Sequence, residues 1–283
     1  MKIQKVGVLG AGQMGAGIAQ IAAANGFKVV LRDVKKELCT GAVKKIKAGL
    51  DKRVAQGKES REAADAIVAN IETTVSLDDL ADCGMVIEAI PEILDLKRAA
   101  FKELGEICGG GAILCTNTSS MSVTEIMSLC PKQERCVGMH FFFPVMAMHL
   151  VEVIRGDKTS DSTVENVKAF AADIGKIPVL CRLDTPGFIV NRCLFAFMLE
   201  AVRCYEDGVA SAEDIDSAIK YGLNHPLGPF EMMDLSGLDT FPHVCESLHS
   251  LPVTGWSVPE SVKRLVSEGR LGRKSGRGWH DYE

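Results

Sequence analysis

Short apolar runs alternate with longer amphipathic stretches along the chain as far as residue 181. The apolar runs cover residues 6–9, 28–31, 85–87, 112–115, 136–139, 150–154 and 177–181. Helix-compatible stretches such as 18–24 and 161–174 lie between them. Short strands separated by helices predict an α/β fold, with a mostly parallel sheet and helices on both faces.

A long polar stretch from Glu37 to about Glu72 contains few residues that break a helix. It predicts a pair of helices with one strongly basic face, made by Lys44, Lys45, Lys47, Lys52, Arg53 and Lys58. Two interpretations are open at this point. The face is either simply solvated, as most charged helix faces are, or some of its lysines bind an anionic substrate.

The pattern changes at Thr185-Pro186-Gly187-Phe188, because from there on only helical patterns follow. Residues 189–205 form a long, largely apolar helix pattern. Ser211 and Asp214 have the spacing of a capping box at the start of a second helix. We therefore predict two domains, a sheet-containing one over residues 1–184 and an all-helical one over 185–283.

The most informative motif lies between the first predicted strand and the first predicted helix. It consists of Gly10, Ala11, Gly12, Gln13, Met14 and Gly15. Glycines let the backbone approach a pyrophosphate, and the free N–H groups of a helix N-terminus point towards it. Asp33 ends the second apolar run, where its carboxylate would accept hydrogen bonds from ribose hydroxyls and repel a 2′-phosphate.

This arrangement predicts a Rossmann-type domain that binds NAD. NADP remains an alternative cofactor, because the guanidinium of the neighbouring Arg32 is suited to a 2′-phosphate. A glycine-rich structural turn in another α/β protein is the alternative interpretation of the motif.

Composition narrows the function further. The net charge of −5, from 32 basic and 37 acidic residues, is not that of a nucleic-acid-binding protein. No apolar run reaches the roughly 20 residues of a membrane helix. The first strand begins almost at Met1, and the 10 cysteines form no CxxC pair. We expect a cytoplasmic protein with reduced thiols and no metal site.

Polar residues follow the predicted strands at one edge of the sheet. Gly10, Asp33, Glu92, Ser119 and His140 each come just after a strand. Ligands of such sheets bind beyond the carboxyl ends of the strands, so this convergence predicts an active site there.

These residue types are suited to hydride transfer coupled to proton transfer. His140 is the candidate base for a secondary alcohol whose carbon gives hydride to a nicotinamide. Glu152 lies in an apolar strand and needs a partner, which the imidazole would provide. Ser119 and Asn191 are candidate donors to substrate oxygens, although Asn117–Ser120 has the composition of a helix N-cap as well. No GxSxG elbow surrounds Ser119, so a serine hydrolase is excluded.

Several motifs together resemble a known family. They are the Gly10–Gly15 turn, 88-EAIPE-92, 117-NTSS-120, 138-GMHFF-142, 150-LVEV-153, 186-PGFIVNR-192, 225-HPLGP-229 and 272-GRKSG-276. The chain is similar to L-3-hydroxyacyl-CoA dehydrogenases over essentially its whole length. Within that family it most resembles the bacterial 3-hydroxybutyryl-CoA dehydrogenases of fatty acid and butyrate metabolism.

The resemblance implies a role for each matching residue. His140 would be the general acid/base with Glu152 as its partner, and Ser119 and Asn191 would contact the 3-oxygen of the substrate. The NAD site would comprise Gly10–Gly15, Asp33, Glu92, Lys97, Ser119 and Lys274, and CoA would contact Lys52, Lys45 and Ser119. The family also implies a homodimer formed through the helical domain.

One position departs from the family. Phe143 stands where the family has an asparagine beside the nicotinamide, and a phenyl ring cannot supply the hydrogen bonds of an amide. The following Met146-Ala147-Met148 also differs from the usual proline-containing stretch.

The predicted function is reversible oxidation of short (S)-3-hydroxyacyl-CoA, such as 3-hydroxybutyryl-CoA, to 3-oxoacyl-CoA with NAD(P). Two alternatives differ in class or substrate. One is a non-catalytic NAD-binding or sensing protein on the same fold. The other is a dehydrogenase for free 3-hydroxy acids, for which a basic CoA site would be unexplained.

Overall fold

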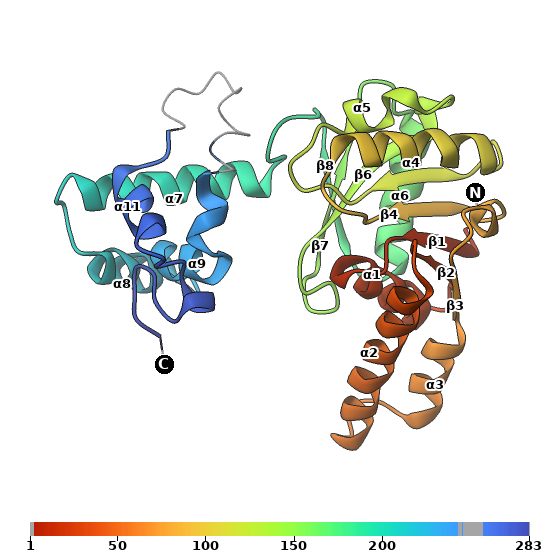
Figure 1. The fold of residues 1–283 in the computed structure, drawn as a ribbon, viewed down its shortest axis with the longest axis horizontal. Coiled ribbons are helices and arrows are strands. Elements are labelled where there is room, and N and C mark those ends of the chain that lie inside the picture. The colour runs from red at the N-terminus through yellow and green to blue at the C-terminus, as the bar shows by residue number, and fades with distance from the viewer. Residues whose placement is uncertain (1–2, 243–244, 246–256, 283) are drawn as a thin grey trace. The chain divides into compact units, whose positions relative to one another are not determined.

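The computed structural model describes residues 3–242, 245 and 257–282 (Figure 1). The chain divides into two compact units, Met1–Thr185 and Pro186–Glu283.

The first unit contains one eight-stranded sheet, in which the strands lie in the order β3-β2-β1-β4-β5-β6-β7-β8. The strands are β1 (Lys5–Leu9), β2 (Lys28–Arg32), β3 (Ile71–Thr74), β4 (Met85–Glu88), β5 (Ile113–Thr116), β6 (Cys136–Phe141), β7 (Leu150–Ile154) and β8 (Ile177–Cys181). Neighbouring strands run parallel, except that β6 and β7 are antiparallel. The predicted mostly parallel α/β sheet is therefore confirmed.

The strand order reverses between β1 and β4. From β1 the chain proceeds outward through β2 and β3 on one side, and then returns to place β4 on the other side of β1. In open sheets of this kind the crevice for a ligand forms at that reversal, outside the carboxyl ends of the two strands. The glycine turn follows β1 directly, so the topology places it at this crevice.

Helices cover both faces of the sheet. The first unit contains α1 (Gln13–Ala24), α2 (Lys36–Ala55), α3 (Arg61–Ala69), α4 (Leu94–Ile107), α5 (Val123–Ile126) and α6 (Asp161–Asp173), with short 3₁₀ turns η1 (Asp78–Leu80), η2 (Met127–Leu129) and η3 (Gln133–Arg135). Residues of α1 and α6 pack against one face, and α4 contacts β5 outside that cluster. The predicted helix pair is present as α2 and α3, which extend together from the unit (Figure 1).

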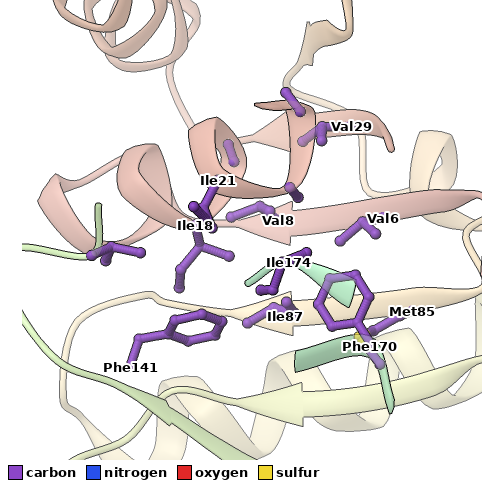
Figure 2. Packing of buried hydrophobic residues seen from close by; sticks show 14 of the residues in the cluster. Val6, Val8, Ile18, Ile21, Val29, Met85, Ile87, Phe141, Phe170 and Ile174 are labelled. Atoms are coloured by element: carbon purple, nitrogen blue, oxygen red, sulfur yellow. The ribbon is translucent and has the colours of Figure 1, made fainter. Parts of the chain in front are cut away.

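The core of the first unit forms from alternate residues of the strands. Val6 and Val8 of β1 point to the same face because side chains alternate along a strand, and both are completely buried. They pack with Ile18, Ile87 and Phe170, as Figure 2 shows. Each such side chain contributes about 1.5–3 kcal/mol by leaving water, which fixes the sheet beneath the glycine turn.

Two local predictions are corrected by the structure. The helix pair ends at Ala69, and residues Ile71–Thr74 form the edge strand β3 instead of continuing the pair. Ile71 alone of these four is buried, so the short segment lacks the apolar run of the other strands. His140 lies inside β6 and not after it, because the antiparallel pairing with β7 extends the strand to Phe141.

The second unit is helical in its described residues. It contains α7 (Val190–Glu206), α8 (Ala212–Leu223), α9 (Pro229–Ser236) and α11 (Glu260–Ser267), with 3₁₀ turns η4 (Leu238–Thr240) and η5 (Arg273–Ser275). Ser211 caps α8 and accepts from the backbone N–H of Asp214, as its spacing predicted. The core is aromatic at its centre, where the Trp279 ring lies 4.7 Å from that of Phe230 and 5.0 Å from that of Tyr205.

A completely buried carboxylate holds the C-terminal residues against α9. Asp234 accepts hydrogen bonds from the backbone N–H groups of Trp279 and His280, each at 2.9 Å. The Tyr282 hydroxyl donates to the same carboxylate at 2.9 Å. These contacts keep Trp279 in the core and hold the segment that carries Lys274.

We expect Asp234→Ala to destabilise the second unit by several kcal/mol. Two buried N–H groups lose their acceptor, at about 1–3 kcal/mol for each unsatisfied group. Urea unfolding followed by tryptophan fluorescence measures the loss. The control is Asp281→Ala, which removes an exposed carboxylate from the same segment and is expected to change stability by less than about 0.5 kcal/mol. Equal effects of the two substitutions would contradict the anchoring role of Asp234.

Candidate active site

The glycine turn after β1 brings two backbone segments into close contact. Gly10 has φ +107°, and a Cβ atom there would lie 2.5 Å from the carbonyl oxygen of Ala89. A Cβ on Gly15 would lie 1.8 Å from the carbonyl oxygen of Gly10. Only glycine fits at either position. A Cβ on Gly12 would meet nothing within 4 Å, so that side of the turn is open to a ligand.

The residues of this turn fit a dinucleotide. Helix α1 begins at Gln13, and its N-cap residue Gly12 provides no side-chain hydrogen bond to the first turn. The N–H groups of that turn therefore have no side-chain cap, which is the arrangement that binds a pyrophosphate.

Asp33 lies at the end of β2 and is hydrogen-bonded to the turn. Its carboxylate accepts from the backbone N–H groups of Ala11 and Val34, both at 2.7 Å. A carboxylate has about four acceptor positions, so two stay available for ribose hydroxyls. The neighbouring Arg32 donates from Nε to the carbonyl of Val75 at 3.2 Å, which directs this nitrogen towards the end of β3.

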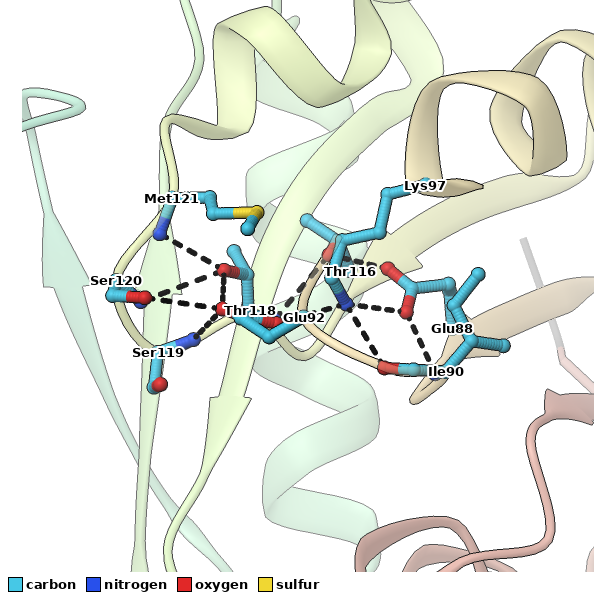
Figure 3. A network of polar contacts seen from close by, with 9 residues as sticks. All are labelled: Glu88, Ile90, Glu92, Lys97, Thr116, Thr118, Ser119, Ser120 and Met121. Atoms are coloured by element: carbon cyan, nitrogen blue, oxygen red, sulfur yellow. Dashed lines mark hydrogen bonds and ion pairs between the residues drawn. The ribbon is translucent and has the colours of Figure 1, made fainter. Parts of the chain in front are cut away.

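A buried ion-pair network lies beside the turn, where β4 ends (Figure 3). The ammonium of Lys97 lies 2.6 Å from Oε1 of Glu88 and 3.1 Å from Oε2 of Glu92. The side chains of Lys97 and Glu88 are 1% and 0% exposed. Thr116 donates to the other oxygen of Glu88 at 2.7 Å, so charge and hydrogen bonds compensate its burial.

Glu92 connects this network to the loop after β5. Its carboxylate accepts from the Thr118 hydroxyl, from the Ser119 N–H at 3.1 Å and from the Ser120 hydroxyl at 3.3 Å. Burial raises the pKa of Glu92, but the Lys97 charge and the hydrogen bond from Thr118 outweigh it and hold the pKa below its ordinary value. The charged Glu92 thereby fixes the loop that carries Ser119.

His140 and Glu152 face each other across the antiparallel pair β6–β7. Nδ1 of His140 lies 2.8 Å from Oε2 of Glu152, and both side chains are almost completely buried. The partner expected for the Glu152 carboxylate is thus present. A carboxylate at Nδ1 favours the tautomer in which Nδ1 carries hydrogen and Nε2 is an acceptor. The ring also packs against Phe142, with centroids 4.5 Å apart.

The loop after β6 is held on its buried side by Lys176 and exposes Phe143 on its other side. Lys176 is buried and donates from Nζ to the carbonyls of Val145 and Met148, at 2.6 and 2.7 Å. Burial lowers the pKa of Lys176. Phe143, which departs from the family, is 62% exposed, and no other described residue of this loop exposes as large a ring.

The remaining predicted site residues lie in three other places. Lys45 and Lys52 are exposed on α2. Asn191 is the second residue of α7, and Lys274 lies in η5, where its ammonium is 2.5 Å from Asp239. Asn191 and Lys274 thus belong to the second unit. The first unit itself brings together the glycine turn, Asp33, Glu92, Lys97 and the Ser119 loop.

Sequence reasoning missed the part of Glu88, Thr116 and Thr118 in this site. Glu88 and Lys97 are nine positions apart and sit at the end of β4 and in α4, so no helical or strand spacing links them. The available signal was a glutamate that ends a fully apolar strand, since such a carboxylate needs a cation nearby.

Three features together define the class of protein. They are a glycine turn where the strand order of the sheet reverses, an aspartate at the end of the next strand, and a buried histidine–carboxylate pair. The protein is a dinucleotide-binding dehydrogenase of the Rossmann type.

Comparison with known proteins identifies the family. Residues 5–185 match the family described as "3-hydroxyacyl-CoA dehydrogenase, NAD binding domain", and residues 187–282 match "3-hydroxyacyl-CoA dehydrogenase, C-terminal domain". The chain therefore belongs to the 3-hydroxyacyl-CoA dehydrogenase family. The family resemblance, the NAD cofactor and the fold class inferred from the sequence are confirmed.

Individual relatives match over nearly their whole length. A probable 3-hydroxybutyryl-CoA dehydrogenase of Deinococcus radiodurans is 43% identical, covering 98% of this chain and 100% of the relative. Human mitochondrial hydroxyacyl-coenzyme A dehydrogenase is 40% identical, covering 99% and 92%. The crystal structure of (S)-3-hydroxybutyryl-CoA dehydrogenase from Ralstonia eutropha superposes with a TM-score of 0.95 at 38% identity, covering 100% of both chains.

The described residues contain neither a membrane-spanning helix nor a cluster of metal-ligating side chains. None of the helices there combines the length and apolar character needed to span a bilayer. Among the same residues, no three histidine, cysteine or acidic side chains are grouped so that they could hold a metal ion. All ten cysteines are free thiols, and eight of them are buried.

We expect Lys97→Met to destabilise the first unit by about 3–5 kcal/mol, because it leaves the completely buried Glu88 without its cation. Urea unfolding measures the change. Lys102→Met replaces an exposed lysine of the same helix and is expected to have little effect.

Adding Glu88→Gln to Lys97→Met tests the reason for this loss. Removing both buried charges should restore part of the stability, since replacing a whole buried pair is often close to neutral. A double variant less stable than Lys97→Met would contradict the ion-pair explanation.

Proposed function

We propose that this protein reversibly oxidises short (S)-3-hydroxyacyl-CoA thioesters, such as 3-hydroxybutyryl-CoA, to 3-oxoacyl-CoA with NAD. The observation that carries the proposal is the buried His140–Glu152 pair, at the same sheet edge as a turn that fits a dinucleotide. Family membership over the whole chain supports the same reaction.

The residues would share the work of proton transfer and orientation. Bound NAD would supply the acceptor for the hydride that leaves C3. Nε2 of His140 takes the proton of the substrate hydroxyl, and in the reverse direction it returns this proton to the 3-oxygen. Glu152 holds the ring through Nδ1 and balances the positive charge that the ring acquires. Ser119 and Asn191 donate hydrogen bonds to the oxygen at C3.

Cofactor binding is assigned to the turn and the network beside it. Gly10–Gly15 would hold the pyrophosphate, Asp33 the adenosine ribose, and Glu92 with the Ser119 loop the nicotinamide end. The side chain of Lys97 is 1% exposed and its ammonium pairs with two carboxylates, so we assign Lys97 to the NAD site through its ion pair with Glu92. Lys274 belongs to the same site in this proposal.

Substrate binding and assembly are assigned to the remaining predicted residues. The exposed ammonium groups of Lys52 and Lys45 are suited to the phosphates of CoA. The helical unit would bind substrate and form the homodimer. We place the protein in the cytoplasm. Its substrate would be an acyl-CoA thioester of butyrate or fatty acid metabolism.

Phe143 supports one competing function. An exposed phenyl ring in place of the family's asparagine suits a protein that binds NAD without turning over substrate. The experiment below distinguishes the two functions.

The direct test is reduction of acetoacetyl-CoA by the purified protein, with NADH and NADPH in separate assays. We expect turnover with NADH and at least tenfold lower kcat/KM with NADPH, because Asp33 repels a 2′-phosphate. Free acetoacetate should be a much poorer substrate, since it lacks the CoA that Lys52 would contact. NAD binding without any turnover would favour the non-catalytic function, and faster turnover of the free acid would favour the alternative substrate class.

We expect His140→Gln to lower kcat by about 10²–10⁴-fold, the usual contribution of a general acid or base. Glu152→Gln should also lower kcat, since it removes the carboxylate that sets the tautomer. The matched control is His149→Gln, at an exposed histidine of the adjacent loop. Steady-state assays with acetoacetyl-CoA and NADH measure all three, and a loss of only a few-fold in His140→Gln would refute the assignment.

A further inference from the structure

Two cysteines of the first unit lie at the edge of the sheet opposite the candidate active site. Cys130 follows η2, and Cys136 is the first residue of β6. Because β6 runs parallel to β5, its first residue lies away from the carboxyl ends of these strands, where ligands of such sheets bind. The two residues are 3% and 0% exposed, and the proposed reaction uses neither.

The turn between the two cysteines holds their sulfur atoms together. The side chains of Cys130 and Cys136 are hydrogen-bonded to each other. The N–H of Lys132 donates to the Cys130 sulfur, and the carbonyl of Lys132 accepts from Sγ of Cys136 at 3.7 Å. The two thiols therefore meet at one residue of the turn and are already neighbours.

Cys130 also packs closely against the last turn of α4. A Cβ atom on Gly105 would lie 2.8 Å from Sγ of Cys130 and 2.6 Å from Cδ of Pro131. The glycine thus allows the thiol to approach the helix. Pro131 and Lys132 are exposed, so the sulfur lies directly beneath a surface turn.

A buried cation lies beside this thiol. Arg135 is 5% exposed, and its terminal nitrogens donate to the backbone carbonyls of Gly105, Cys108, Gly109 and Ala112. Its Nε has no hydrogen-bond partner among the described residues. A guanidinium stays charged in proteins, and carbonyls carry no net charge to compensate it. An anionic sulfur at Cys130 supplies that compensation.

Three donors contact the Cys130 sulfur, namely the Cys136 thiol, the Lys132 N–H and the Arg135 guanidinium. A neutral thiol is a weak acceptor, so this arrangement is suited to a thiolate. The hydrogen bond from Cys136 and the other two donors outweigh burial and hold the pKa of Cys130 below its ordinary value. The same pairing raises the pKa of Cys136, which therefore keeps its proton.

Other buried thiols of this unit have different surroundings. Sγ of Cys108 donates to the carbonyl of Leu80, and Sγ of Cys39 to that of Thr74, both at 3.5 Å. Burial raises the pKa of both thiols. They are typical of structural cysteines, which pack as small apolar side chains.

We propose that Cys130 and Cys136 form a modification site for peroxides, in which Cys130 is the attacking thiolate and Cys136 the resolving thiol. The Cys130 sulfur attacks one oxygen of hydrogen peroxide, so that an S–O bond forms and the O–O bond breaks. The sulfur gives two electrons to the peroxide, and the hydroxide that leaves takes up a proton to become water.

The second step closes the disulfide. The Cys136 sulfur attacks the sulfenic sulfur of Cys130, so that an S–S bond forms and the S–O bond breaks. The departing hydroxide takes the Cys136 proton and leaves as water. One peroxide and two thiols thus give one disulfide and two waters, and a cellular dithiol reverses the modification.

The test treats the full-length protein with a small excess of hydrogen peroxide, blocks the remaining thiols and maps the digest by mass spectrometry. We expect a Cys130–Cys136 disulfide that dithiothreitol removes. Cys130 should be consumed at least about tenfold faster than Cys39, because an ordinary thiol is only a few per cent ionised at neutral pH.

Three variants assign the roles within the pair. Cys136→Ser should stop the reaction at a sulfenic acid, which dimedone traps on Cys130, and Cys130→Ser should leave Cys136 unoxidised. The matched control is Cys108→Ser, at a buried cysteine whose carbonyl contacts the same arginine, and it should leave the disulfide unchanged.

The wild-type protein decides the outcome even where a variant does not fold. Oxidation of Cys130 no faster than that of Cys39, or a disulfide between Cys130 and Cys108, would overturn the proposal. The inference is independent of the proposed function, which reduction of acetoacetyl-CoA by the untreated protein tests separately.

Discussion

The close approach of two backbone segments at the reversal of the sheet determines where everything else in the first unit can lie. The N–H of Gly10 donates to the carbonyl of Arg32, and that of Ala89 donates to the carbonyl of Leu9. These bonds join the ends of β1, β2 and β4 in one layer. The N-terminus of α1 therefore opens at the crevice, with Asp33 on one side and the segment leading to Glu92 on the other.

The carboxylates at this edge of the sheet are paired with two different kinds of cationic side chain. Glu88 and Glu92 are paired with one lysine, Lys97. Glu152 is paired with a histidine, the side chain whose ordinary pKa lies closest to neutrality. The lysine holds the loop that carries Ser119 through Glu92. In the proposed reaction the histidine takes up and returns a proton, which is a common role of imidazole in proteins.

Much of the fold could be predicted because its patterns are local. The strand–glycine–helix sequence around Gly10 and the capping residue Ser211 depend on neighbours within a few positions. The edge strand at Ile71 could not be found, since only one of its residues is buried and its pairing with β2 is long-range. His140 was predicted just after its strand but lies inside it, because pairing with β7, which begins ten residues further along the chain, extends β6.

The candidate site also has a part that local sequence patterns predict and a part that depends on tertiary packing. Residue types and strand ends were sufficient to nominate His140, Glu152 and Asp33. The pairing of Glu88 with Lys97 depends on how α4 packs above β4, which no spacing encodes. A cavity beside Asn191 is lined by α7 on one side and by the consecutive segments α9 and η4 on the other, so its existence follows only from tertiary packing.

The position of Trp279 has a consequence for how the chain is made. Its indole packs at the aromatic centre of the helical unit against Tyr205 and Phe230, which precede it by many residues along the chain. The helical unit can therefore complete its core only after residue 279 has emerged from the ribosome. The sheet, whose last strand ends at Cys181, can form earlier during translation.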